Sequence, residues 1–134
     1  MTSSIVAQLR FLLDTQILIW SAIDPSKLNG EVSAILGRPE SELLVSSVTI
    51  AEMEIKIALG KLALPGSPAE LCKQLGATEL ELNWKHASGL SALPPIHKDP
   101  FDRLLIAQAI AEDLPFITSD GHILQYPQVK LVRN

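Results

Sequence analysis

Four carboxylate side chains fall at points where the sequence changes from one pattern to another. Asp14 and Asp120 each follow a short apolar run, Glu52 lies about one helical turn beyond another such run, and Asp102 lies in the first turn of an apolar helix. Carboxylates gathered in one place repel one another, so without a cation at least one pKa should rise. Because hard divalent cations prefer oxygen ligands, the four acids indicate a site for Mg²⁺ or Mn²⁺.

A carboxylate-held pair of Mg²⁺ ions suits the hydrolysis of phosphodiester bonds. The metal ions activate a water molecule and stabilise the leaving oxygen. A zinc site is a poorer match, because Cys72 is the only cysteine and His86, His97 and His122 lack the spacing of zinc ligands. We interpret the three histidines as surface or structural residues. The acids therefore predict metal-dependent cleavage of a phosphodiester.

Most of these acids also have an ordinary structural interpretation. Thr49-x-x-Glu52 matches a capping box, in which Glu52 would only accept a hydrogen bond from the backbone N–H of Thr49. Asp102 would favour a helix N-terminus by about 0.3–1 kcal/mol, and Asp120 precedes a glycine, which is typical of a turn. Asp14 is the hardest to explain in this way, since the end of a strand needs no acid.

The segment 99–111 predicts a buried helix. Asp99 is suited to the N-cap, and Pro100 to the first helical position, where its missing N–H costs nothing. Beyond the first turn, Gln108 is the only polar residue, and a helix that is apolar nearly all round is a buried one. We therefore assign Asp99 to capping and Asp102 to the metal site.

Strands and helices alternate along the chain. Short apolar or alternating runs predict strands at 11–13, 43–48, 78–82, 114–118 and 129–132. Helical spacing and capping residues predict helices at 15–22, 28–36, 49–59, 68–75, 84–90 and 100–111. This order favours a mostly parallel sheet with helices on both faces. Such sheets bind ligands outside the carboxyl ends of their strands, where we expect the acids to meet.

Length and composition limit the possible classes of protein. The 134 residues predict a single domain over 1–134, and 47% hydrophobic residues suffice for a sizeable core. A net charge of −4 excludes binding of nucleic acid by bulk positive charge. Any chemistry on nucleic acid would therefore need metal ions and a local basic rim. The single cysteine fits a reducing cytoplasm, and no apolar run approaches the ~20 residues of a membrane span.

Two further expectations concern the start of the chain and the tryptophans. Residues 1–10 lack the pattern of a signal peptide and are expected to form a loosely ordered lead-in. Trp20 and Trp84 are interpreted as packing residues rather than as platforms on which nucleic-acid bases stack.

The chain resembles PIN-domain ribonucleases, most closely the VapC-type toxins of prokaryotic toxin–antitoxin pairs. The resemblance spans about residues 11–132 and rests on segments in the family's order: LLDT at 12–15, SSVTIAE at 46–52, IKxxLGKL at 55–62, DPFDRLLIAQA at 99–109 and TSD at 118–120. The segment at 99–109 is a specific signal, whereas LLDT is weak by itself. Gln16 and Ala51 depart from the His and Trp that this branch often has, and the lead-in is longer than usual; none of these departures affects the acids.

The resemblance implies a three-layer α/β/α sandwich with a mostly parallel central sheet, and cleavage of RNA that depends on Mg²⁺ or Mn²⁺. It also implies a homodimer and a cognate antitoxin protein as partners. The family's catalytic and metal-binding acids fall on Asp14, Glu52, Asp102 and Asp120. The hydroxyl often found near the metal falls on Thr118, and the remaining candidates for supporting residues are Asp99 and Arg103.

Other classes of protein match the sequence less well. A haloacid-dehalogenase-like phosphatase needs a second Asp two residues after the first, where this chain has Gln16. A phospho-receiver domain needs its acceptor Asp at the end of the middle strand, where this chain has residues 46–48, Ser-Ser-Val. The alternatives that remain are another carboxylate–metal phosphoesterase and a PIN-like RNA-binding domain without activity.

Overall fold

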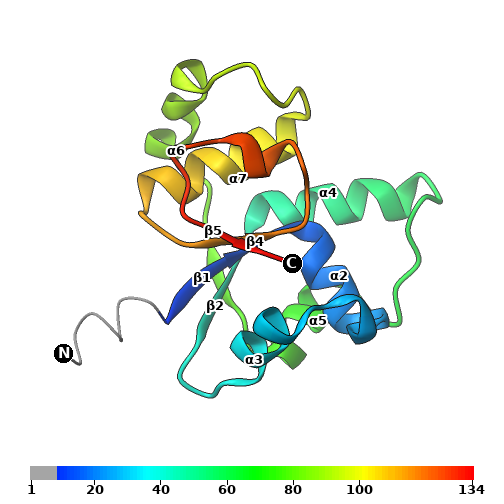
Figure 1. Cartoon of the computed structure of the whole chain (residues 1–134). Coiled ribbons are helices and arrows are strands. Elements are labelled where there is room, and N and C mark those ends of the chain that lie inside the picture. The colour runs from blue at the N-terminus through cyan, green and yellow to red at the C-terminus, as the bar shows by residue number, and fades with distance from the viewer. Residues whose placement is uncertain (1–8) are drawn as a thin grey trace.

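A five-stranded, fully parallel sheet forms the centre of the computed structural model, which describes residues 9–134 (Figure 1). Its strands are β1 (Arg10–Leu13), β2 (Glu42–Ser46), β3 (Thr78–Leu80), β4 (Phe116–Thr118) and β5 (Leu131–Arg133), in the spatial order β3-β2-β1-β4-β5. Of the predicted lead-in, residues 1–8 lie outside the described part of the chain. Arg10 falls in the predicted lead-in but begins β1 in the structure.

Within residues 9–134, six α-helices connect and cover the strands of this sheet. They are α2 (Thr15–Ile23), α3 (Gly30–Gly37), α4 (Ser47–Ala58), α5 (Pro68–Leu75), α6 (Trp84–Ser88) and α7 (Pro100–Ala111). The short 3₁₀ helices are η1 (Pro25–Lys27), η2 (Gly89–Ala92) and η3 (Ile123–Gln125). Among the described helices, none has the length and apolar character needed to cross a membrane.

The sheet separates two apolar cores. Side chains alternate along a strand, so Phe11 and Leu13 of β1 pack with α2, α3 and α5, whereas Leu12 packs with α7 on the opposite face. Helix α4 contributes Val48 to one core and Met53 to the other. Figure 1 shows α6 and α7 on one side of the sheet and α2, α3 and α5 on the other. The expected three-layer α/β/α sandwich is therefore confirmed.

Several predicted boundaries shift because a polar side chain ends one element and begins the next. The strand expected at 43–48 stops at Ser46, whose hydroxyl accepts a hydrogen bond from Val48 N–H (3.0 Å) and caps α4. The helix expected at 28–36 begins only at Gly30, because Asn29 caps it. Strands β3, β4 and β5 are each three residues long, shorter than the predicted runs, and the short helix η3 was not predicted.

The two tryptophans differ in their surroundings. Trp20, a residue of α2, is partly buried and packs against the core, as expected. Trp84, at the start of α6, is 91% exposed, so its interpretation as a packing residue is wrong. A bulky apolar side chain indicates burial only on average, and the N-terminal position in a five-residue helix leaves this ring outside the contact between α6 and α7.

Candidate active site

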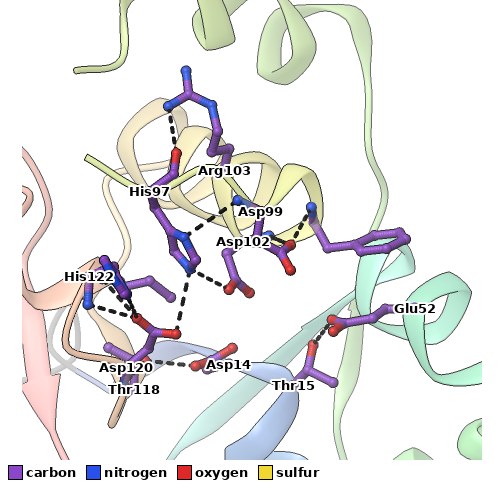
Figure 2. A network of polar contacts seen from close by, with 12 residues as sticks. Asp14, Thr15, Glu52, His97, Asp99, Asp102, Arg103, Thr118, Asp120 and His122 are labelled. Atoms are coloured by element: carbon purple, nitrogen blue, oxygen red, sulfur yellow. Dashed lines mark hydrogen bonds and ion pairs between the residues drawn. The ribbon is translucent and has the colours of Figure 1, made fainter. Parts of the chain in front are cut away.

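The four acids predicted from the sequence converge at the carboxyl ends of β1 and β4. Figure 2 shows their side chains pointing into one region from four separate segments of the chain. Together with Asp99 they border a cavity of about 250 Å³ that is lined by Asp14, Thr15, Gln16, Ile19, Glu52, Lys56, Asp99, Asp102, Ser119 and Asp120. The parallel sheet explains this convergence, since its strands all end at the same edge.

Asp14 lies in the turn between β1 and α2. It occupies the N-cap position of α2, but its side chain makes no capping bond. Instead, Asp14 Oδ2 accepts a hydrogen bond from Thr118 Oγ1 at 2.7 Å, because β1 and β4 are neighbours in the sheet. Burial raises the pKa of Asp14 to about 6, with smaller contributions from the charges of Asp120 and Glu52, while the bond from Thr118 opposes the rise.

Glu52 is buried on α4, where it does not form the capping box with Thr49. Because Ser46 caps the helix, Thr49 lies inside it, and the Glu52 carboxylate is free to turn toward α2. Glu52 accepts hydrogen bonds from Thr15 Oγ1 and Lys56 Nζ, each at 2.8 Å. The bond to Glu52 raises the pKa of Lys56, so a positive charge is held against this carboxylate.

Asp99 and Asp102 make different contacts, although they lie three residues apart at the start of α7. Asp99 Oδ1 accepts hydrogen bonds from the N–H groups of Phe101 (2.9 Å) and Asp102 (3.1 Å), which confirms it as the N-cap of α7. The Asp102 carboxylate turns instead toward His97 and the cavity. Burial raises the pKa of Asp102 to about 7, the charges of Asp14 and Asp99 add to this, and His97 opposes it.

Asp120 both stabilises a turn and borders the cavity. Its Oδ1 accepts hydrogen bonds from the N–H groups of His122 (2.8 Å) and Ile123 (3.2 Å) and so holds the start of η3. Its Oδ2 lies 3.5 Å from His97 Nε2. The backbone N–H of Asp120 also donates to Thr118 Oγ1 at 3.0 Å, so the threonine hydroxyl links Asp120 to Asp14.

His97 lies beside two of the acids, although from the sequence we interpret it only as a surface or structural residue. Its Nε2 lies 2.7 Å from Asp102 Oδ2, and its ring stacks on that of His122 with a centroid distance of 4.9 Å. The position of His97, two residues before the N-cap of α7, is the signal that could have revealed it. His86, by contrast, is buried beside the other end of α7 and pairs with Glu112 at 2.7 Å, which confirms a structural role.

Arg103 does not line the cavity, although we considered it as a supporting residue. Its guanidinium points away from the acids and donates to the carbonyl oxygens of Leu90 (3.2 Å), Pro94 (3.1 Å) and His97 (3.2 Å), as Figure 2 shows in part. Arginine has five donors in a fixed fork, so it can hold several carbonyls at once. Arg103 therefore fixes the segment that carries His97 and acts on the site only through it.

The ligand set of the cavity fits a hard divalent cation. Five carboxylates border the cavity, and Lys56 is its only basic lining residue within the described chain. Burial is the main cause of the raised pKa values of Asp14 and Asp102, and the charges of neighbouring carboxylates add to it, so a bound cation would offset part of this cost of ionisation. Mg²⁺ and Mn²⁺ match these ligands because they prefer carboxylate oxygens. Asp14, Glu52, Asp102 and Asp120 line the cavity and could supply carboxylate oxygens to such an ion.

The fold and the cavity define an α/β/α protein with an acidic site at the carboxyl edge of a parallel sheet. The sequence model of the PIN domain matches residues 11–128, and the chain therefore belongs to the PIN-domain family. A search of curated protein sequences gives no significant match.

Solved structures with the same fold include members of three VapBC complexes. A chain of VapBC from Salmonella typhimurium, solved bound to DNA, has a TM-score of 0.67 at 16% identity, covering 93% of this chain and 98% of that one. A chain of VapBC2 from Rickettsia felis, solved bound to a promoter DNA fragment, has a TM-score of 0.66 at 14% identity, covering 92% of this chain and 98% of that one. A chain of VapBC-5 from Mycobacterium tuberculosis, a member of the VapBC family of toxin–antitoxin systems, has a TM-score of 0.58 at 19% identity, covering 94% of this chain and 99% of that one. At these identities the likeness establishes the fold.

Proposed function

We propose that this protein is a metal-dependent endoribonuclease and the toxin of a type II toxin–antitoxin pair. The observation that supports this proposal most strongly is the convergence of Asp14, Glu52, Asp102 and Asp120 on one cavity of a PIN-family fold. The structural neighbours that come from toxin–antitoxin complexes favour the same assignment. A cytoplasmic location and a single domain over residues 1–134 are parts of the proposal.

In this proposal the four acids hold Mg²⁺ or Mn²⁺, which when bound supplies an activated water and stabilises the leaving oxygen of the phosphodiester. The chain itself keeps the carboxylates in place. Thr118 fixes Asp14, and Thr15 fixes Glu52, through hydrogen bonds of 2.7 and 2.8 Å. Each bond restricts a carboxylate that would otherwise turn away from its neighbours, because like charges repel.

The negative charge of the cavity supports an order of binding in which the metal precedes RNA. An RNA phosphate is repelled by the acids, and a chain with a net charge of −4 offers no bulk attraction to offset that. Lys56 is already paired with Glu52. A divalent cation therefore has to neutralise the site before a phosphate can approach the carboxylates.

We expect the purified protein to cleave single-stranded or loop RNA only when Mg²⁺ or Mn²⁺ is present. The assay uses defined transfer and messenger RNAs with each ion, with Ca²⁺ as a control cation, and with excess EDTA. Undiminished cleavage in EDTA would contradict the metal mechanism. Tight RNA binding without cleavage would favour the alternative of an inactive RNA-binding domain, and hydrolysis of small phosphate esters alone would favour another phosphoesterase.

We also propose that the protein forms a homodimer and binds an antitoxin protein. Exposed apolar side chains such as Ile55 on α4 and Leu59 at its C-cap, which are 48% and 63% exposed, are the kind of surface that partners cover. Light scattering at tens of micromolar should therefore give the mass of a dimer. A monomer under these conditions would contradict the dimer, and the antitoxin would then have to bind a single chain.

A further inference from the structure

Two histidines and one of the acids form a second group of potential metal ligands at the edge of the cavity. Asp120 lies beside both His97 and His122: its Oδ2 is 3.5 Å from His97 Nε2, and its Oδ1 is 3.7 Å from His122 Nδ1. One ligand atom from each of the three residues can be chosen so that all lie within 4.8 Å of one another. Figure 2 shows both rings on the same side of Asp120.

These distances suit a small transition-metal ion. Ligand atoms that lie about 2.0–2.1 Å from a tetrahedral ion are about 3.3–3.4 Å apart. The Asp120 contacts of 3.5 and 3.7 Å are close to this spacing, but they involve different carboxylate oxygens, so an ion held by both rings requires either both oxygens of Asp120 or a small turn of its carboxylate. The stacked rings face each other, so one ring has to turn before both nitrogens point at the same ion. His122 is free to do so, because its side chain is 63% exposed, whereas that of His97 is only 13% exposed.

The chemistry of this group differs from that of the carboxylate site. Imidazole nitrogen suits Zn²⁺ and similar ions, whereas Mg²⁺ takes oxygen ligands and water. His97 Nε2 is also 2.7 Å from Asp102 Oδ2, so a second carboxylate lies beside the first three ligands. Two imidazoles and one or two carboxylates are a common ligand combination for zinc.

We propose that His97, His122 and Asp120 form a second metal site, selective for Zn²⁺ or another ion that prefers imidazole, and that its occupation inhibits the carboxylate site. An ion bound there takes Asp120, which the carboxylate site would otherwise share. It also occupies His97 Nε2, the atom that holds Asp102. Binding of Zn²⁺ is independent of the proposed nuclease activity, and only the inhibition rests on that proposed function.

The binding test measures Zn²⁺ affinity by calorimetry on tag-free protein in saturating Mg²⁺. His122→Ala should weaken Zn²⁺ binding by about tenfold or more, because it removes a ligand. Gln125→Ala is the matched control and should bind like wild type, because Gln125 is exposed at the end of η3, the helix that His122 precedes as its N-cap. Asp14→Asn should retain Zn²⁺ binding, because Asp14 is not one of the three ligands.

Two results of the binding test would overturn the proposal. If His122→Ala binds Zn²⁺ as tightly as wild type, the histidine is not a ligand. If Asp14→Asn loses Zn²⁺ binding and His122→Ala does not, the ion occupies the carboxylate site instead. Visible absorption spectra of the Co²⁺ forms provide a second readout, since a nitrogen-containing site of low coordination number absorbs more strongly than a hydrated oxygen site.

The activity test adds Zn²⁺ to RNA cleavage that is supported by Mg²⁺. Zn²⁺ should inhibit wild type and Gln125→Ala, and His122→Ala should need about tenfold more Zn²⁺ for the same inhibition. With Mg²⁺ alone, His122→Ala should cleave within about twofold of wild type, because His122 does not line the cavity. Zn²⁺ binding without inhibition would overturn the coupling of the two sites, and absence of RNA cleavage with Zn²⁺ binding intact would overturn only the proposed nuclease.

Discussion

Replacement of Asp14 by asparagine should reduce RNA cleavage by at least about 100-fold while leaving the fold intact, since loss of even an outer-sphere partner of a metal typically costs 10–100-fold. Asparagine has nearly the shape of aspartate and can still accept the hydrogen bond from Thr118. The substitution removes one negative charge from the cluster of acids that lines the cavity. Cleavage rates over a range of Mn²⁺ concentrations should show a loss that added metal restores only in part.

In the absence of metal at pH 8, the Asp14→Asn variant should be at least as stable as the wild-type protein. Asp14 is buried, and its raised pKa means that its ionised form is unfavourable in the folded state. Asp113→Asn is a suitable control, because Asp113 is exposed at a position with φ of 53°, which asparagine tolerates well. Full activity of Asp14→Asn, with Asp113→Asn also active, would remove Asp14 from the site.

The second large effect should distinguish Asp99 from Asp102, which lie three residues apart at the start of α7. Asp99→Ala removes an acceptor for two backbone N–H groups and should lower the free energy of unfolding by about 0.5–2 kcal/mol, with only mildly weaker cleavage. Asp99→Ser keeps an oxygen at the cap and should recover most of that stability. Asp102→Asn should do the opposite, abolishing cleavage without lowering the stability of the metal-free protein.

The stability of Asp102→Asn should depend on pH in a predictable direction. The pKa of Asp102 is raised from 3.8 to about 7 in the folded protein, so its protonated form is favoured there. As pH rises from 4 through 7, wild type has to ionise this buried group and loses stability, whereas the asparagine variant does not. The variant should be more stable than wild type by about 1–2 kcal/mol at pH 8, after allowance for partial solvent exposure, and not at pH 4.

Thermal melting in EDTA at pH 4 and pH 8, together with cleavage rates in Mn²⁺, tests both substitutions. The expected pattern is a loss of stability for Asp99→Ala and a loss of activity for Asp102→Asn. If Asp99→Ala is the inactive variant and Asp102→Asn the active one, the ligand has been assigned to the wrong acid. Added Mn²⁺ should raise the melting temperature of wild type more than that of Asp102→Asn, because a bound ligand stabilises the folded state.

Local patterns in the sequence determined much of the fold and the main acids of the site. Apolar runs that end in an acid revealed the strand ends that carry Asp14 and Asp120, and Asp-Pro revealed the start of α7 with Asp99 as its cap. Alternation of strands and helices was enough to predict a parallel sheet with two helical layers. These features were accessible because caps, turns and side-chain periodicity depend on residues close together in the chain.

Only the tertiary structure decided which polar side chains meet. Glu52 bonds Thr15 rather than the backbone of Thr49, and the contact between α2 and α4 that allows this joins residues 37 positions apart. His97 turns into the site while Arg103 turns away from it, although both border the start of α7. No local pattern distinguishes these choices, because each depends on the charge and space that distant segments provide once the sheet has formed.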